Sequence, residues 1–86
     1  MVKTIYQERY LRLINALIQA RKNAGLTQAQ VAEKLSKPQS YIAKIEGADR
    51  KLDVVEFVEL CETIHQDPSE LIKVLGTIGV AKANTA

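Results

Sequence analysis

The segment PQSYIAKIE, residues 38–46, carries side chains whose types and spacing suit hydrogen bonding to another molecule. On a helix that turns about 100° per residue, Tyr41, Ile42 and Ile45 fall on one side, as a core-facing stripe does. The opposite side carries residues that are small or bear hydrogen-bond donors and acceptors, namely Gln39, Ser40, Ala43 and Lys44. An ordinary solvated face would hold more charge. This outward face is therefore the first candidate for a recognition surface.

Catalytic or metal-binding chemistry finds little support in the residue pattern. A helix predicted over residues 53–65 has an apolar stripe that consists of Val54, Phe57, Val58, Cys61 and Ile64. Cys61 lies inside this stripe and His65 at its end, so both are predicted to pack rather than to act as nucleophile, base or metal ligand. No glycine-rich phosphate-binding loop is present. We expect a protein that is not an enzyme and that needs no cofactor, metal or small-molecule ligand.

Composition predicts one small all-helical domain in the cytoplasm. The 86 residues are 47% hydrophobic but only 5% aromatic, and they contain neither an export leader nor a membrane-length apolar run. Residues 1–51 hold ten Lys and Arg against four Asp and Glu, whereas residues 52–86 hold two against six. Such a split can mark a surface that binds nucleic acid, and a merely solvated surface is the alternative.

Helix start signals divide the chain into five helices. Thr27 with Gln30, and Asp53 with Glu56, have the spacing of capping boxes, and Pro38 suits the first turn of a helix. The predicted helices cover residues 6–23, 27–35, 38–46, 53–65 and 68–76, within a single domain over residues 1–86 that ends in a tail over residues 77–86. Two short helices joined by a tight turn are typical of a helix-turn-helix domain, whose recognition helix enters the DNA major groove.

Several motifs in register resemble one family. The segments GLTQAQVAEKL, SKPQSYIAKIEG, RKLDVVEF and DPSELI resemble the Cro/lambda-repressor-like (XRE) family of bacterial and phage transcriptional regulators. The similarity extends from about Tyr10 to Leu75, which is most of the chain. It implies an all-α, five-helix lambda-repressor-like DNA-binding domain that binds double-stranded DNA.

The resemblance also implies a role for each matching position. Base-reading positions of the family correspond to Gln39 and Ser40, and a glutamine amide can pair with adenine through two hydrogen bonds. On the same face, Lys44 is long enough to reach guanine or the DNA backbone, and Ala43 either offers a methyl contact to thymine or is simply small enough to let the helix approach. Positions that contact the DNA backbone correspond to Gln28, Arg50 and Lys51, and Lys37 is a further candidate because its flank of the recognition helix faces the backbone of the groove. Arg21 and Glu46 match a structural ion pair between the first and third helices. Taken alone, Gln28 could equally be a solvated residue of a first helical turn, and Arg50 and Lys51 ordinary surface charges.

Two positions depart from the family pattern. Ser36 stands in the turn where the family usually has glycine, which predicts a turn of different shape. Pro38 stands where the family often has a capping Ser or Thr. The sequence therefore predicts that Ser36 and Gln39 form the capping box of the recognition helix.

The C-terminal region predicts a homodimer. Its apolar residues outnumber those that one face of a short helix can bury, and they comprise Leu71, Ile72, Val74, Leu75, Ile78 and Val80. The predicted interface centres on Leu71, Leu75 and Ile78. The expected function is a sequence-specific DNA-binding regulator, as a repressor; the alternative is a helix-turn-helix module that binds a protein partner, such as an anti-repressor or a toxin.

Overall fold

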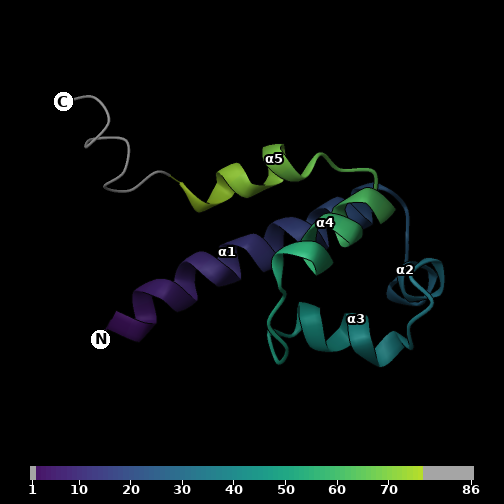
Figure 1. Ribbon diagram of the computed structural model, residues 1–86, viewed down its shortest axis with the longest axis horizontal. Helices are drawn as coiled ribbons and strands as arrows, with labels where there is room; N and C mark the ends of the chain where they lie inside the picture. Colours follow the sequence, from purple (N-terminus) through teal and green to yellow (C-terminus); the bar gives the residue numbers. More distant parts are fainter. Residues whose placement is uncertain (1, 77–86) are drawn as a thin grey trace.

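α1 (Val2–Asn23) is the longest helix of the described residues (Figure 1). A computed structural model describes residues 2–76. The remaining elements are α2 (Gln28–Lys34), α3 (Gln39–Glu46), α4 (Val54–Thr63), α5 (Pro68–Leu71) and the 3₁₀-helix η1 (Ile72–Leu75). The predicted all-α fold of five helices is thus confirmed, with no strand among the described residues. None of the described helices is long and apolar enough to cross a membrane.

Some helix boundaries differ from the predicted ones. α1 begins at Val2, before the predicted residue 6, and α4 ends at Thr63 rather than at residue 65. The last predicted helix is a single α-turn that tightens into η1 and ends before Gly76, whose φ of 79° is incompatible with a right-handed helix. The predicted tail, residues 77–86, lies outside the described residues.

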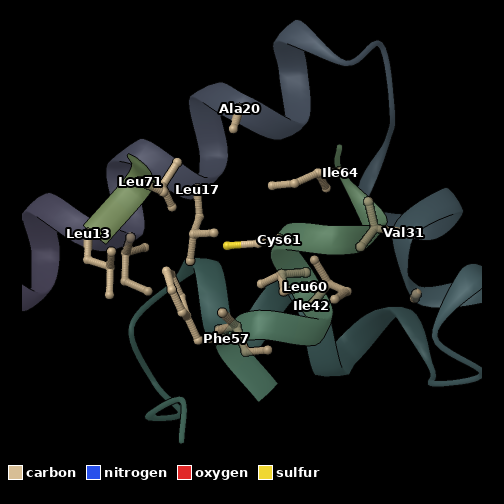
Figure 2. Close-up of a cluster of buried hydrophobic side chains, with 13 residues drawn as sticks. Leu13, Leu17, Ala20, Val31, Ile42, Phe57, Leu60, Cys61, Ile64 and Leu71 are labelled. Atoms are coloured by element: carbon tan, nitrogen blue, oxygen red, sulfur yellow. The ribbon is translucent and has the colours of Figure 1, made fainter. Parts of the chain in front are cut away.

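The core lies where α1, α2, α3 and α4 meet (Figure 2). It is built from aliphatic side chains, one phenylalanine and one thiol: Leu13, Ile14, Leu17, Ala20, Val31, Ala32, Ile42, Ile45, Phe57, Leu60, Cys61, Ile64 and Leu71. Cys61 is fully buried, as predicted, and this burial, with the nearby carboxylates of Asp67 and Glu62, raises the pKa of its thiol to about 11. The thiol is therefore protonated and unreactive at neutral pH.

The buried stripe of α4 is rotated from the predicted one. Val54 was expected to face the core, but 78% of its surface is exposed, and Leu60 is buried instead. At about 100° per residue, Phe57, Leu60, Cys61 and Ile64 share one face, and the direction of Val54 lies at the edge of that face. The stripe prediction was therefore wrong for Val54, because it weighed apolar spacing without knowing where the neighbouring helices lie.

Short-range side-chain bonds begin three of the helices. Thr27 accepts from the backbone N–H of Gln30, whose side chain accepts in return from the N–H of Thr27, so the predicted capping box is present. Asp53 and Glu56 form the second predicted box. At α5 the carboxylate of Asp67 accepts from the N–H of Ser69. These bonds satisfy backbone donors that a helix start leaves without an intrahelical partner.

α1, α2, α3 and α4 all end in the same double-bonded turn, the Schellman motif. In each, the residue after the C-cap is left-handed; these residues are Gly25 (φ 75°), Ser36 (57°), Ala48 (61°) and His65 (62°). At the end of α4, for example, the N–H of Gln66 donates to the carbonyl of Cys61 and the N–H of His65 to that of Glu62. His65 is exposed at this turn, so the prediction that it packs in the core was wrong. It fell outside the stripe because α4 ends two residues earlier than predicted.

Candidate nucleic-acid interface

The turn between α2 and α3 has the backbone conformation that a glycine turn would have. Ser36 takes the left-handed conformation, and the N–H of Lys37 donates to the carbonyl of Ala32 at 2.9 Å. Ser36 therefore reproduces the backbone that glycine would adopt. The predicted Ser36–Gln39 capping box was wrong, because Ser36 belongs to the end of α2. Pro38 is the N-cap of α3 and makes no side-chain bond there.

The outward face of α3 is one continuous exposed surface in the direction that the sequence predicts. Ile42 and Ile45 are almost fully buried and anchor the helix in the core. The four residues predicted to read bases are all exposed, and they are Gln39, Ser40, Ala43 and Lys44. α3 therefore presents donors, acceptors and a methyl group on a rigid element, while the opposite face holds it in place.

A hydrogen-bond network leads from the core to this face. Arg21 and Glu46 form a two-pronged ion pair, with Nε to Oε2 at 2.7 Å and Nη2 to Oε1 at 3.0 Å. Arg21 Nη1 also donates to the carbonyl of Leu26 at 2.8 Å. The Nε2 of Gln28 donates to Glu46 Oε1 at 2.9 Å, and the Nε2 of Gln39 donates to Gln28 Oε1 at 3.4 Å. Gln39 is thus linked through Gln28 and Glu46 to α1.

The family resemblance implied the pair of Arg21 and Glu46, but it did not join Gln28 and Gln39 to that pair. The side chains of Arg21 and Glu46 are only 11% and 10% exposed, so the pair is shielded from water. The turn joins the end of α2 to the start of α3, so it gives no signal that Gln28, at the start of α2, meets Gln39. Spacing alone does not show which side-chain atoms meet.

Beside the recognition face lies a basic hollow of about 550 Å³. We call it the α3 flank hollow, and it is lined by Lys37, Pro38, Ser40, Tyr41, Lys44, Asp49 and Arg50. Three of these side chains are cationic and one is anionic. The hollow therefore suits an anion, and two candidate base-reading residues, Ser40 and Lys44, lie on its wall.

Arg50 occupies one wall of the hollow and is held on several sides. Its Nη1 and Nη2 donate to the two carboxylate oxygens of Glu56 at 2.9 and 2.8 Å, and Nη1 also donates to the carbonyl of Lys51 at 3.2 Å. The guanidinium carbon lies 4.9 Å from the centre of the Tyr41 ring. Arg50, with the backbone N–H of Asp53, lowers the pKa of Glu56 to about 2, so Glu56 remains ionised well below neutral pH.

Two aromatic rings support the other predicted backbone-contacting cations. The ammonium of Lys37 lies 5.1 Å from the centre of the Tyr41 ring, and that of Lys51 lies 5.1 Å from the centre of the Tyr10 ring. The hydroxyl of Tyr10 donates to the carbonyl of Arg50 at 3.3 Å and accepts from the N–H of Leu52 at 3.1 Å. Tyr10 therefore ties the loop after α3 to α1. The roles of Tyr10, Tyr41 and Glu56 at this surface were not predicted from the sequence.

The helix-turn-helix, with an exposed polar face on its second helix and cations beside it, defines a class of regulator that recognises a partner with that helix. A model of the helix-turn-helix family matches residues 17–71. A solved structure described as an XRE-family like protein from Pseudomonas syringae pv. tomato str. DC3000 is 42% identical, with a TM-score of 0.84, and the match covers 91% of this chain and 95% of that one. Among curated proteins, no match was found. The chain belongs to the XRE family of helix-turn-helix regulators.

Proposed function

We propose that this protein is a cytoplasmic transcriptional repressor that binds double-stranded DNA as a homodimer, with α3 in the major groove. The observation that carries the proposal is the exposed face of α3, where Gln39 is held by the network of Gln28 and Glu46. An α-helix fits the major groove, where each base pair presents a distinct pattern of donors and acceptors. A protein bound to an operator that overlaps a promoter represses transcription, because it excludes polymerase.

Gln39 is suited to recognise adenine. One N–H of its amide donates to Gln28, which leaves the second N–H and the carbonyl oxygen for a base. Adenine needs this pair, since its N7 accepts a hydrogen bond and its N6 donates one. Gln28 likewise has a second N–H beyond the one given to Glu46, and that donor is suited to a backbone phosphate.

The cations beside α3 supply affinity that does not depend on sequence. Lys37 and Arg50 line the α3 flank hollow, and Lys51 follows Arg50 in the loop between α3 and α4. Phosphate contacts from such residues fix the register of a protein on the duplex, while base contacts read the sequence. The proposal therefore divides the surface into a reading face on α3 and a phosphate-binding flank.

Selection of bound sequences from random duplex DNA tests this function directly. On the selected site, Gln39→Ala should weaken binding about tenfold while leaving the affinity for random DNA nearly unchanged, because it removes a base contact. Lys51→Ala is the matched control, and it should weaken binding to both kinds of DNA and reduce the salt slope by about one unit. Equal losses for Gln39→Ala on both DNAs would assign Gln39 to a phosphate. Failure to enrich any sequence, with no salt-dependent binding, would favour a protein partner instead.

The proposed dimer interface needs revision at Leu71. The structure places Leu71 in the core of its own domain, where it is unavailable to a second copy, and Leu75 is partly buried. Ile78 and Val80 lie outside the described residues. Ile72 is 44% exposed and lines an apolar hollow of about 190 Å³ together with Tyr10, Leu13, Leu52, Asp53, Val54 and Phe57. This apolar surface supports a dimer centred on Ile72 rather than on Leu71.

Replacing Ile72 with Glu should convert the dimer to a monomer, because a charge cannot be buried at an apolar interface without a partner. Sedimentation should show the change in mass, and circular dichroism should show nearly unchanged helical content. Val55→Glu is the matched control, since Val55 is also apolar and is 65% exposed, but it does not line this hollow. A parent chain that is monomeric at high micromolar concentration would contradict the dimer.

A further inference from the structure

Glu56 both caps the start of α4 and binds Arg50. Its Oε1 accepts from the backbone N–H of Asp53 at 3.1 Å, while its own N–H donates to Asp53 at 2.7 Å. The same carboxylate binds Arg50 through both oxygens. The cap restricts the side chain of Glu56 at the start of α4. Because the same carboxylate binds Arg50, the guanidinium of Arg50 is held in a fixed position relative to α4.

The contacts of Arg50 leave one complete edge of the guanidinium available. An arginine has five N–H groups, and three of them are used here, two by Glu56 and one by the carbonyl of Lys51. Since Glu56 takes the edge between Nη1 and Nη2, the remaining N–H groups are those of Nε and the second of Nη2, which lie side by side. This edge is a fork that matches two oxygens of a phosphate.

The available edge is accessible to a ligand. The Arg50 side chain is 39% exposed. Among the described residues, every buried side-chain nitrogen has a hydrogen-bond partner. The Nε of Arg50, which has no partner there, is therefore in contact with solvent. Tyr41 lies against the guanidinium and restricts its rotation. Arg50 thus presents a solvated fork in a fixed orientation at the wall of the α3 flank hollow.

We propose that Glu56 is a positioning residue for DNA binding. It holds Arg50 so that Nε and Nη2 of the guanidinium donate hydrogen bonds to a phosphate of the strand beside α3. The inference rests on the proposed DNA-binding function. A competing role for Glu56 would be repulsion of the phosphate or competition for Arg50. The hydrogen-bond count favours positioning, because a phosphate on the available edge does not displace Glu56, and the guanidinium lies between the two anions.

The two roles predict effects of opposite sign when the carboxylate is neutralised. Glu56→Gln keeps an oxygen that can cap Asp53, since glutamine also serves in a capping box. If Glu56 positions Arg50, the variant must order this long side chain on binding, and affinity for the selected DNA site should fall about two- to tenfold. The salt slope should change little, because Arg50 keeps its charge and still reaches the phosphate. Removal of a repelling charge would instead raise affinity.

Asp49→Asn is the matched control, because Asp49 lines the same hollow and forms no ion pair with another described residue. This variant should bind DNA more tightly than the parent. In an Arg50→Ala background, Glu56→Gln should cause no further loss, since a positioning residue acts only through its partner. Arg50→Lys should weaken binding as Glu56→Gln does, because an ammonium lacks two separate edges.

Fluorescence anisotropy over a salt series, at a temperature where circular dichroism shows each variant folded, measures all of these affinities. Binding by Glu56→Gln that equals or exceeds that of the parent would overturn the role of Glu56 while leaving the DNA-binding function intact. Binding by Arg50→Lys that equals that of the parent would overturn it as well, even if Glu56→Gln did not fold. A parent that binds no duplex in a salt-dependent way would overturn the proposed function, and this inference with it.

Discussion

Replacing Glu46 with Ala should lower the free energy of unfolding by about 3 kcal/mol or more, which is a large share of the stability of a small domain. The carboxylate of Glu46 accepts from two nitrogens of Arg21 and from the amide of Gln28. Removing it leaves the Arg21 guanidinium shielded from water with only the carbonyl of Leu26 as an acceptor. A charge left without its partner in such a place is far more costly than the loss of one ordinary hydrogen bond.

Chemical denaturation monitored by circular dichroism measures this loss. Glu70→Ala is the matched control, because Glu70 also pairs with a cation, Lys73, at 3.0 Å but does so in solvent. That control should change stability by less than about 1 kcal/mol. If Glu46→Ala lowered the free energy of unfolding no more than Glu70→Ala does, water would have to reach Arg21 in the variant. The buried pair would then not stabilise the fold.

The elements that sequence reasoning predicted correctly are those decided by neighbours in the chain. A capping box joins residues three positions apart, so Thr27 with Gln30 and Asp53 with Glu56 are visible in the sequence. Gly25 likewise marks the end of α1, because a left-handed residue there favours glycine. Such local signals were sufficient to predict five helices and the tight turn between the second and third.

The elements that it missed depend on contacts between helices. Nothing in the spacing of Gln28 and Gln39 states that one amide donates to the other. Arg50 and Glu56 are six positions apart, and Tyr10 sets the path of the loop that brings them together. Burial of Leu71 likewise depends on where α5 packs against α1. The outward direction of α3 was predictable from its periodicity, whereas the partners that orient its side chains were not.

Ser36 shows why a prediction from capping-box spacing alone can fail. Its hydroxyl and its spacing from Gln39 suggested a cap for α3, but its backbone is needed in the left-handed region to end α2. The turn therefore keeps the shape that glycine would give it, with a serine under strain. Ala48 and His65 likewise place a residue other than glycine in the left-handed conformation.

Changing these three residues together, Ser36→Gly, Ala48→Gly and His65→Gly, should raise the free energy of unfolding by about 2 kcal/mol. A left-handed backbone costs an ordinary residue about 1 to 2 kcal/mol, and the greater entropy of glycine in the unfolded chain offsets about 0.5 to 1 kcal/mol of each gain. The sites lie at the ends of three different helices, so the gains should add. Thermal unfolding should show a rise in Tm of about 10 °C.

Gly25→Ala is the reverse control, because Gly25 has the same conformation, with φ of 75°. A Cβ added there would meet no other atom within 4 Å, so any loss reports backbone strain alone. This variant should be less stable than the parent by about 1 kcal/mol. A destabilised Gly25→Ala beside an unchanged triple variant would mean that Ser36, Ala48 and His65 gain compensating contacts from their side chains. If Gly25→Ala were itself neutral, the left-handed turn at the end of α1 would relax without cost, and the strain argument would fail at all four helix ends.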